Sequence, residues 1–380
     1  MFKRARGFEL KIAIVVERFP PDTGGSGVRF CKLAERLSRK HTLDVFTVGP
    51  IRALNLGRGF NVHRFDLEKL PIPRLWGLNS VVSLTSSTFF QLSFRSYDII
   101  DIDIWPFLPF FSAKMAKPNT PAILSWNVVW PFSFQKATSG ISTLFARACS
   151  KLSTHNITVS NFAKTMLLKH LQMNPSTVSM IPNGIDEAFF KAKLRPKWGQ
   201  IVFVGRLEPQ KRLDLILAAF KIFRKNVNDA ELHIVGEGSL KSQLVLASKK
   251  VDGLYLHGSI PAGSTQELIS TLDKSWIFVS ASEFETYGMS ISEALGMGLP
   301  VVLTNAPNNA AVHETAKHGF NSLIVEHNQP MAIANAFERL YKDRELWDRL
   351  SSNAKSFPVS YSWDDVAKRV EAVYEEVSRR

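Results

Sequence analysis

Residues 201–235 read IVFVGRLEPQKRLDLILAAFKIFRKNVNDAELHIV and contain one complete strand–helix–strand pattern. The apolar run Ile201–Val204 predicts a buried strand, the periodicity of Arg212–Lys225 predicts a helix, and Leu232–Val235 predicts a second buried strand. Two apolar strands joined by a helix are typical of parallel pairing, in which helices cover both faces of the sheet. This stretch therefore predicts an α/β fold.

The same alternation of apolar runs and helical patterns extends in both directions along the chain. In the first half, strands are predicted at Lys11–Val16, Leu43–Val48, Asn61–Phe65, Ile99–Ile104, Ala122–Trp126, Asn156–Ser160 and Val178–Ile181. In the second half, further strands are predicted at Leu254–His257, Ile277–Ser280, Val301–Thr304 and Leu323–Val325, and helices elsewhere include Val28–Arg39 and Ile291–Met297. Because the alternation restarts near Ile201 and 380 residues exceed one ordinary core, we expect two doubly wound, Rossmann-like domains.

The boundary between the two domains is predicted in the polar stretch Asp186–Gln200, which contains Pro196 and Gly199. We expect residues 1–185 to form the first domain and residues 186–362 the second. The end of the chain, Trp363–Val377, carries valines at helical spacing and predicts an amphipathic last helix.

Composition excludes several classes of protein. No run approaches the roughly 18 apolar residues that a membrane-spanning helix needs. The early apolar run Ile12–Val16 is too short for the core of a signal peptide. The two cysteines, Cys31 and Cys149, lie far apart, which argues against a disulfide scaffold and favours buried thiols in a reducing compartment. We therefore expect a cytoplasmic protein without a transmembrane anchor.

The net charge of +13 is unevenly distributed. Residues 1–180 hold 23 Lys and Arg against 10 Asp and Glu, and no acidic residue occurs between Asp103 and Asp186. That window holds the cations Lys114, Lys117, Lys136, Arg147, Lys151, Lys164 and Lys169, and the aromatics Trp105, Phe107, Phe110, Phe111, Trp126, Trp130, Phe132 and Phe134. Two interpretations stay open: a face for an anionic membrane or acceptor, or a basic domain with aromatics in its core.

In doubly wound sheets, ligands bind beyond the carboxyl ends of the strands, so the loops that follow strands are the candidate sites. After the first strand comes FPPDTGGSG, residues 19–27. Its glycines Gly24, Gly25 and Gly27 would let backbone amides approach an anionic ligand at a helix N-terminus. An ordinary strand-to-helix turn explains the same residues equally well.

The loop Gly205–Arg212 follows the first strand of the second half and reads GRLEPQKR. Arg206 could make a forked contact to a diphosphate and Lys211 could act as a point charge, although a solvated charge run is the alternative. Farther along, Gly236-Glu237-Gly238 predicts either a tight turn beside a nucleotide base or a plain loop.

The strongest signal is SEFETYGMSISEAL, residues 282–295. It places Glu285 on a strand-to-helix loop and Glu293 inside the helix that follows, with Gly288 between them. Carboxylates accept hydrogen bonds from hydroxyls and therefore suit sugar and ribose rings, and two acids in an otherwise apolar segment indicate a site.

Taken together, these motifs resemble those of the family 4 glycosyltransferases, which have the two-domain GT-B fold with a central cleft. The resemblance covers most of the chain and is densest from Ile181 to Val325. The matching pieces are PPDTGG at 20–25, IPNGID at 181–186, GRL at 205–207, GEG at 236–238, the Glu285 and Glu293 pair, GLPVV at 298–302 and GFN at 319–321.

The resemblance implies a retaining hexosyltransferase of glycan biosynthesis that uses a nucleoside-diphosphate sugar, needs no cofactor and binds no metal. Arg206 and Lys211 would neutralise the departing diphosphate, Glu293 would hold the ribose, and Glu285 would hold the donor sugar. The implied donor-binding residues are Gly24, Gly25, Gly205, Arg206, Lys211, Gly236, Glu237, Gly238, Glu285, Tyr287, Gly288, Met289 and Glu293. The first domain would bind the acceptor, and the last helix would pack on it.

One departure from the family pattern concerns catalysis. Asn127 stands where the family usually carries a histidine, and an amide cannot take a proton at neutral pH. Either the proton passes to the leaving phosphate with help from Asp103 or Asp22, or the chain is a weak or inactive relative that binds a nucleotide sugar.

Three other functions are weighed against transfer. A non-catalytic nucleotide-sugar-binding protein is motivated by Asn127. A sugar-nucleotide epimerase would need acid/base carboxylates and histidines on both sides of the cleft, but the first-half histidines His41, His63, His155 and His170 do not fall in evident ligand loops. Nucleic-acid binding lacks a helix-turn-helix, zinc-finger or RNA-recognition signature, so the positive charge favours contact with an anionic acceptor or a peripheral position on the inner face of a membrane.

Overall fold

The computed structural model describes residues 9–22, 24–49, 59–65, 78–129, 139–261, 263–356 and 362–379. Contacts between residues divide the chain into two compact units. The first unit consists of Met1–Gly184 and Trp363–Arg380, and the second of Ile185–Ser362.

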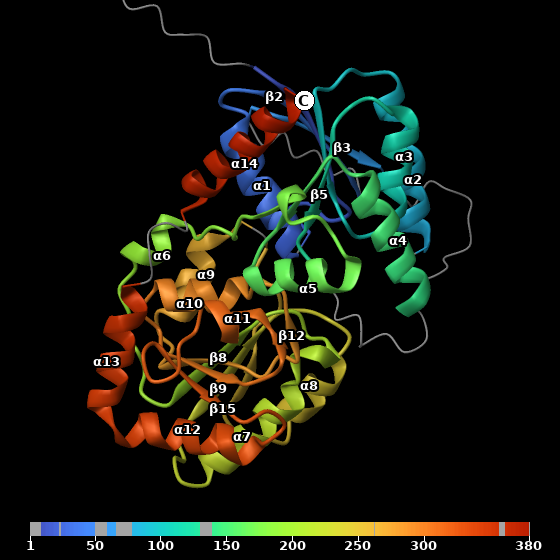
Figure 1. Ribbon diagram of the computed structural model, residues 1–380. Coiled ribbons are helices and arrows are strands. Elements are labelled where there is room, and N and C mark those ends of the chain that lie inside the picture. The colour runs from blue at the N-terminus through green and yellow to red at the C-terminus, as the bar shows by residue number, and fades with distance from the viewer. Residues whose placement is uncertain are drawn as a thin grey trace, which may run out of the picture. The chain divides into compact units, whose positions relative to one another are not determined.

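The first unit is built on a seven-stranded parallel sheet in the order β3-β2-β1-β4-β5-β6-β7 (Figure 1). Its strands are β1 Lys11–Val15, β2 Thr42–Val48, β3 Asn61–Phe65, β4 Ile99–Asp103, β5 Ala122–Trp126, β6 His155–Thr158 and β7 Val178–Met180. Its helices are α1 Gly25–Leu37, α2 Leu78–Ser93, α3 Leu108–Ala116, α4 Ser139–Leu152, α5 Asn161–Leu171 and α14 Trp363–Ser378, with the short 3-10 helix η2 Pro175–Thr177. The strands at the centre are buried throughout, because helices cover both faces of the sheet.

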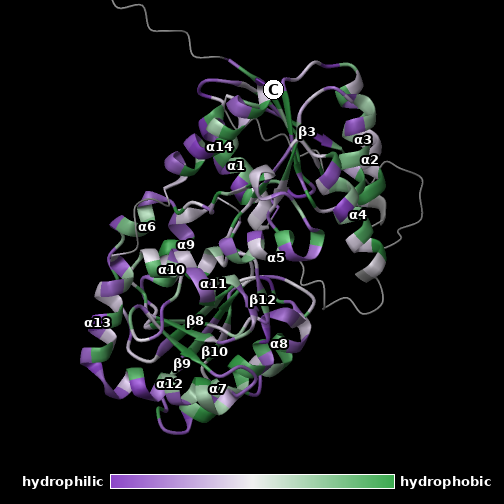
Figure 2. Cartoon of the chain, in the orientation of Figure 1, coloured by the Kyte–Doolittle hydropathy of each residue, from purple (hydrophilic) through white to green (hydrophobic). Residues whose placement is uncertain are grey.

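The second unit contains a six-stranded parallel sheet in the order β10-β9-β8-β11-β13-β15. These strands are β8 Gln200–Val204, β9 Glu231–Val235, β10 Leu254–Leu256, β11 Ile277–Ser280, β13 Val301–Thr304 and β15 Ser322–Val325. The helices are α6 Glu187–Lys191, α7 Leu213–Arg224, α8 Lys241–Ser248, α9 Thr265–Leu272, α10 Met289–Gly296, α11 Ala310–Glu314, α12 Pro330–Lys342 and α13 Arg344–Lys355, with the 3-10 helix η3 Pro209–Lys211. Figure 2 shows the hydrophobic strands of each sheet lying between helices.

Both sheets reverse their winding direction at one point. In the first unit the order changes beside β1, between β1 and β4, and in the second beside β8, between β8 and β11. A crevice forms at the carboxyl ends of the strands on either side of such a switch point. The loops that carry Gly24, Arg206 and Glu285 follow β1, β8 and β11, so they lie at these two switch points.

Every strand predicted from the sequence is present, and two further strands were not predicted. β12 Phe284–Glu285 pairs in parallel with β14 Asn308–Asn309 to form a separate two-stranded sheet. Strands of two residues leave no alternation in the sequence, so their pairing depends on tertiary contacts alone.

The structure corrects the expected start of the first helix. α1 begins at Gly25, three residues before the predicted Val28, so Gly25 and Gly27 are helical. A Cβ atom on Gly27 would overlap the carbonyl oxygen of Arg18. Gly27 is therefore required by the close approach of α1 to the end of β1, whatever ligand binds there.

The stretch Asp186–Gln200 is not a free linker. It contains α6, whose Phe189 is buried in the core of the second unit with Ile185 and Leu295. The apolar pair Phe189 and Phe190 supplies the burial that a linker of polar residues lacks.

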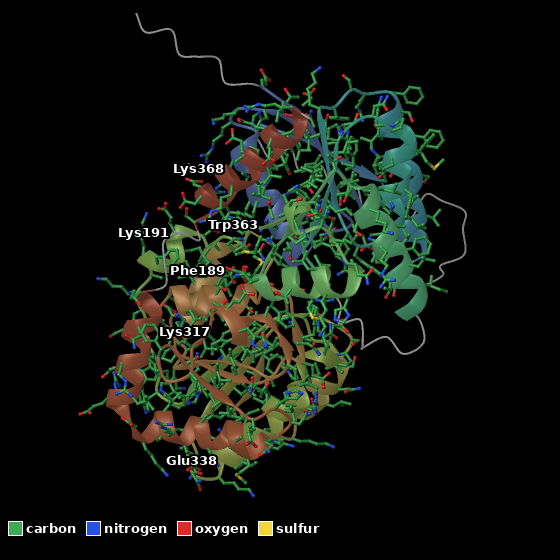
Figure 3. All side chains as sticks on the ribbon, in the orientation of Figure 1. Phe189, Lys191, Lys317, Glu338, Trp363 and Lys368 are labelled. Atoms are coloured by element: carbon green, nitrogen blue, oxygen red, sulfur yellow. The ribbon has the colours of Figure 1, made fainter. Side chains whose placement is uncertain are left out.

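The last helix, α14, belongs to the first unit although the whole second unit precedes it in the chain. Trp363 at its start is buried against Gly184, where a Cβ atom would overlap the indole ring. On the outer side, Lys368 points to solvent (Figure 3). Arg36 contacts Asp364 at 2.5 Å.

No helix within the described ranges is both long and apolar enough to cross a membrane.

Candidate functional site

In the second unit, the loop after β8 is held against the loop after β9. The amide of Gly205 donates to the carbonyl oxygen of Val235 at 3.0 Å, and the amide of Leu207 donates to that of Glu237 at 2.8 Å. Arg206, between them, is exposed, and it forms no ion pair within the part of the chain that the structure describes. Its guanidinium is thus a cation at the carboxyl edge of the sheet, available to an anionic ligand.

The glycines of the loop after β9 have a packing role of their own. A Cβ atom on Gly236 would overlap the carbonyl oxygen of Gly205, and one on Gly238 would overlap that of Leu207. Gly236 also adopts φ +149°, which side chains rarely tolerate. Glu237, between the two glycines, accepts a hydrogen bond from Lys241 at 2.7 Å. Both glycines are therefore needed to bring the two loops together, with or without a nucleotide.

Glu285 is positioned by the two-stranded sheet. Its backbone pairs with Asn309, a buried residue whose side-chain amide donates to the carbonyl oxygen of Ser282 at 3.3 Å. The side-chain oxygen of Asn309 also accepts a hydrogen bond from the amide of Ala311 at 3.1 Å. Asn309 therefore joins the segment that carries Glu285 to the start of α11.

Lys211 forms an ion pair with Glu285, and both side chains are largely buried. The sequence assigned these two residues to different parts of a donor, the diphosphate and the sugar. The ion pair places both side chains at one point beside the loop after β8. A group that binds Lys211 there would therefore also lie close to Glu285.

A second ion pair lies beside the first. Arg212 donates to Glu283 at 2.8 Å and to Asp214 at 2.9 Å. Arg212 directly follows Lys211 in the chain, and Glu283 lies two residues before Glu285. No pattern in the sequence predicts that Arg212 and Glu283 pair. Arg212 also adopts φ +49° at the start of α7, and its contacts to two carboxylates accompany this uncommon conformation.

The remaining donor-side candidates lie at the start of α10. Gly288 adopts φ +86° and precedes Met289, the first residue of the helix. Tyr287 is buried, and Glu293 is half-buried in the second turn. Because a Cβ atom on Gly288 would stand 3.0 Å from the Cβ of Ala311, the glycine also allows α10 to pack closely on α11.

In the first unit, Asp103 and Asn127 lie together at the carboxyl ends of β4 and β5. The Asn127 side-chain amide donates to Oδ1 of Asp103 at 3.1 Å, and Asp103 is buried. Burial raises the pKa of the Asp103 carboxyl to about 7, although hydrogen bonds with Asn127 and Ser26 oppose the increase. Asp103 therefore stands near the midpoint of its titration at neutral pH.

Two neighbours of Asp103 were missed by the sequence analysis. Ser26, in the first turn of α1, hydrogen-bonds to the Asp103 carboxyl, and Glu17, after β1, adds a negative charge that raises its pKa further. Ser26 lies inside the predicted glycine loop, so its position could have suggested a role. Nothing in the sequence indicates that Glu17 faces Asp103.

Behind Asp103, Asp101 joins the sheet to the last helix. Its carboxyl accepts hydrogen bonds from Ser125 at 2.7 Å and from the hydroxyl of Tyr374 on α14. Burial raises the pKa of Asp101 to about 6 against these two hydrogen bonds.

The glycine loop after β1 is described except for Thr23. Gly24 is the extended N-cap residue of α1, and Gly25 begins the helix. Asp22, the alternative proton-handling residue, lies 3.5 Å from Arg64, whose guanidinium also donates to the carbonyl oxygen of Phe19 at 2.9 Å. Asp22 is therefore paired with a cation, whereas Asp103 has only neutral partners among its hydrogen bonds.

The described residues contain no group of three or more His, Cys, Asp or Glu side chains arranged to hold a metal ion.

Two family models match the chain in succession. The model for Glycosyltransferase Family 4 matches residues 23–189, and the model for glycosyl transferases group 1 matches residues 184–357. The chain belongs to the family 4 glycosyltransferases. The boundary between the two matches falls where the two units of this glycosyltransferase meet in the chain.

Relatives of known sequence match this glycosyltransferase over much or all of its length. An uncharacterized glycosyltransferase of Methanocaldococcus jannaschii, MJ1607, is 27% identical over 395 residues, which cover 96% of this chain and 98% of the relative. The UDP-Gal:alpha-D-GlcNAc-diphosphoundecaprenol alpha-1,3-galactosyltransferase of Escherichia coli is 29% identical over 244 residues, 60% of each chain.

Among solved structures, the sucrose-phosphate synthase of Thermosynechococcus elongatus is similar to this glycosyltransferase with a TM-score of 0.80. The two are 17% identical, and the match covers 97% of this chain and 98% of the synthase. The predicted fold class, two parallel-sheet α/β domains of the GT-B type, is thus confirmed.

Proposed function

We propose that this glycosyltransferase moves a hexose from a nucleoside-diphosphate sugar to a hydroxyl acceptor, with retention of the anomeric configuration. The observation that carries the proposal is the grouping of Arg206 and the Lys211–Glu285 ion pair at the carboxyl edge of the second sheet. The similarity to an enzyme whose name specifies a UDP-hexose donor supports the proposed donor class.

Each side chain has a distinct role in the proposal. Arg206 makes a forked contact to the diphosphate, and Lys211 contributes a second positive charge as the phosphate leaves. Glu285 accepts hydrogen bonds from the hexose hydroxyls, and Glu293 accepts them from the ribose. Because two cations neutralise the leaving group, the proposal requires no metal ion.

The reaction is balanced without a further reagent. The bond from the anomeric carbon to the diphosphate oxygen breaks, and the acceptor oxygen forms a new bond to the same face of that carbon. The proton of the acceptor hydroxyl passes to the departing diphosphate. Asp103 assists by accepting a hydrogen bond from a sugar or acceptor hydroxyl, and Asn127, which stands where the family usually has a histidine, orients the Asp103 carboxyl.

The acceptor is proposed to be a glycan, either free or carried on an anionic lipid. The excess of positive charge in the first unit favours an anionic partner, and the name of the Escherichia coli relative specifies a diphosphate-linked lipid acceptor. An acceptor of this class implies that the protein binds the cytoplasmic face of an anionic membrane.

Donor binding is tested by calorimetry against UDP-, GDP- and ADP-hexoses, with Arg206→Ala and Glu293→Ala as variants. We expect one donor class to bind and each variant to weaken it at least tenfold, since a hydrogen bond to a charged group contributes about 1.5–3 kcal/mol. Lys221→Ala, which removes an exposed cation of α7, is the matched control and should bind normally. Wild-type affinity in Glu293→Ala would contradict the assignment of the ribose contact.

Turnover separates transfer from mere binding. Donor hydrolysis or transfer above background, abolished by Arg206→Ala and retained in EDTA, supports the enzyme, and NMR of the product tests retention. A donor that binds tightly and never turns over would instead establish the inactive relative.

A further inference from the structure

Large hydrophobic side chains are exposed mainly on one part of the first unit. Of the sixteen that are exposed among the described residues, eleven lie between Val82 and Leu152. They belong to or adjoin three successive helices, α2, α3 and α4, which neighbour one another in Figure 1. We name these exposed side chains the α2–α4 face: Val82, Phe89, Phe90, Phe94, Trp105, Leu108, Met115, Ile141, Leu144, Phe145 and Leu152.

Helix α4 carries its large apolar residues outward. Ile141 and Leu144 are each 67% exposed, and Leu152 is 53% exposed. With Phe145 they recur at the spacing of one helical stripe. The residues that α4 buries are small, since they include Ala146 and Cys149. An ordinary surface helix has the opposite arrangement.

Helix α2 shows part of the same arrangement. It buries Leu84 and Leu92 together with the hydroxyl residues Ser83 and Thr88, whereas Phe90 is 61% exposed and Phe94, just after the helix, 86% exposed. No charged residue occurs anywhere in Leu78–Ser93, and hydrophobic colour runs along this helix in Figure 2. A solvated helix of that length normally carries charges on its outer face.

The three helices form one support. The ring of Phe145 on α4 stacks on Phe107 with ring centroids 6.3 Å apart and meets the edge of Phe111 on α3 at 5.9 Å. On the other side of α3, Lys117 donates to the carbonyl oxygen of Ser93 at the end of α2, at 3.3 Å. Most of the exposed apolar side chains are therefore carried by packed helices, and Phe94 and Trp105 lie in the segments that adjoin those helices.

Cations border the apolar side chains. Arg147 and Lys151 lie one turn apart on α4, both exposed, along a flank of its apolar stripe. Arg147 donates to the carbonyl oxygen of His170 at 3.0 Å and keeps its charge. Because no Asp or Glu occurs from residue 104 to residue 185, nothing in this part of the sequence neutralises these cations.

We propose that the α2–α4 face docks on an anionic lipid membrane. The exposed apolar side chains of α2 and α4 enter the interfacial region of the bilayer, and Arg147 and Lys151 contact lipid phosphates. Apolar stripes flanked by cations are the composition of helices that lie in a membrane interface. A second copy of the chain is a poorer match, because it would bring the same cations against each other. This inference rests on the proposed function, which names an acceptor carried on a membrane lipid. The α2–α4 face differs from the set of aromatic residues that the sequence indicated, because Phe110 and Trp126 of that set are buried.

Flotation of the full-length protein with vesicles of phosphatidylcholine, with and without phosphatidylglycerol, tests the proposal. We expect binding to the anionic vesicles at low salt and weaker binding at high salt. Phe90→Ser/Phe94→Ser should reduce binding at least tenfold, because burying one aromatic side chain contributes about 1.5–3 kcal/mol. Arg147→Gln/Lys151→Gln should reduce it about 25-fold, at about 1 kcal/mol for each cation near the surface.

Two matched variants lie in the second unit. Leu246→Ser alters a side chain that is 61% exposed, as Phe90 is, and Lys249→Gln/Lys250→Gln removes two exposed cations. Both should bind vesicles as the wild type does. Donor binding without vesicles should be unchanged in all four variants, which separates failure of this inference from failure of the proposed transfer reaction.

Three results would overturn the proposal: no flotation with anionic vesicles, equal binding to neutral vesicles, or wild-type binding by the α2 and α4 variants. A dimer in solution that Phe90→Ser/Phe94→Ser dissociates, without vesicle binding, would assign the face to self-association and also overturn it.

Discussion

At the scale of single residues, the two groups of candidate side chains differ in how they handle charge. In the second unit the carboxylate of Glu285 is paired with the ammonium group of Lys211. In the first unit burial raises the pKa of Asp103 to about 7, although hydrogen bonds from the neutral side chains of Asn127 and Ser26 oppose the increase. The first arrangement places an ion pair where an anionic leaving group would bind, whereas the second favours a carboxyl that exchanges a proton near neutral pH.

The buried Asp103 should make stability depend on pH. Its folded pKa lies above its unfolded value, so the folded chain binds the extra proton between about pH 4 and pH 7. The contribution of Asp103 to the free energy of unfolding is therefore full below pH 4 and is lost as pH rises through 7. Urea unfolding at pH 5 and pH 8 should show a smaller loss in Asp103→Asn than in the wild type. Asp252→Asn, at an exposed position, should leave the loss unchanged, and an equal loss in Asp103→Asn would contradict the assignment.

At the scale of elements, loops at the carboxyl ends of the strands are fixed by backbone contacts between neighbouring loops. The loop after β8 is hydrogen-bonded to the loop after β9, and glycines at 236 and 238 make the approach possible. The separate pairing of β12 with β14 likewise holds Glu285 in place. The donor-side candidates thus occupy a framework built from backbone contacts between loops.

Replacing Gly236 by alanine should disturb this framework. Its methyl group would overlap the Gly205 carbonyl oxygen, and the backbone conformation is unfavourable for alanine, so we expect a loss of about 2 kcal/mol or more and weaker donor binding. Thermal unfolding and calorimetry measure the two effects. Gly140→Ala on α4 has open space around its Cβ position and should be neutral or slightly stabilising. Unchanged stability in Gly236→Ala would show that the loop relaxes at little cost.

At the scale of the whole molecule, the first unit is assembled from two distant segments of the chain. α14 returns to it after the complete second unit, and it is held by Trp363, by the Arg36–Asp364 contact and by the Tyr374–Asp101 hydrogen bond. Glu371 also accepts hydrogen bonds from Lys40 at 2.9 Å and from His41 at 3.2 Å. The fold of the first unit therefore depends on the last sixteen or so residues.

Removing one of these contacts should destabilise the first unit measurably. Tyr374→Phe leaves the buried Asp101 carboxyl without one of its two side-chain hydrogen bonds, so the free energy of unfolding should fall by about 1–3 kcal/mol. Chemical denaturation checks the value. Tyr255→Phe, which changes an exposed tyrosine of β10, is the control and should have no effect. Equal stability of the two variants would mean that Asp101 does not need Tyr374.

The sequence by itself determined the parallel-sheet α/β class, the thirteen main strands and the loops at which the donor-side candidates lie. Those features are readable because they are local: an apolar run, a helical period and a glycine cluster each leave a pattern within a few residues. Only the tertiary structure decided that Lys211 pairs with Glu285, that Ser26 and Glu17 surround Asp103, and that Gly236 is needed for packing. It alone also showed that α4 turns its large apolar residues outward, and that α2 exposes Phe89 and Phe90 while it buries Leu84 and Leu92. These facts depend on contacts between residues far apart in the chain and on which face of a helix is buried. A linear pattern of apolar residues does not tell whether those residues lie on the inner or the outer face.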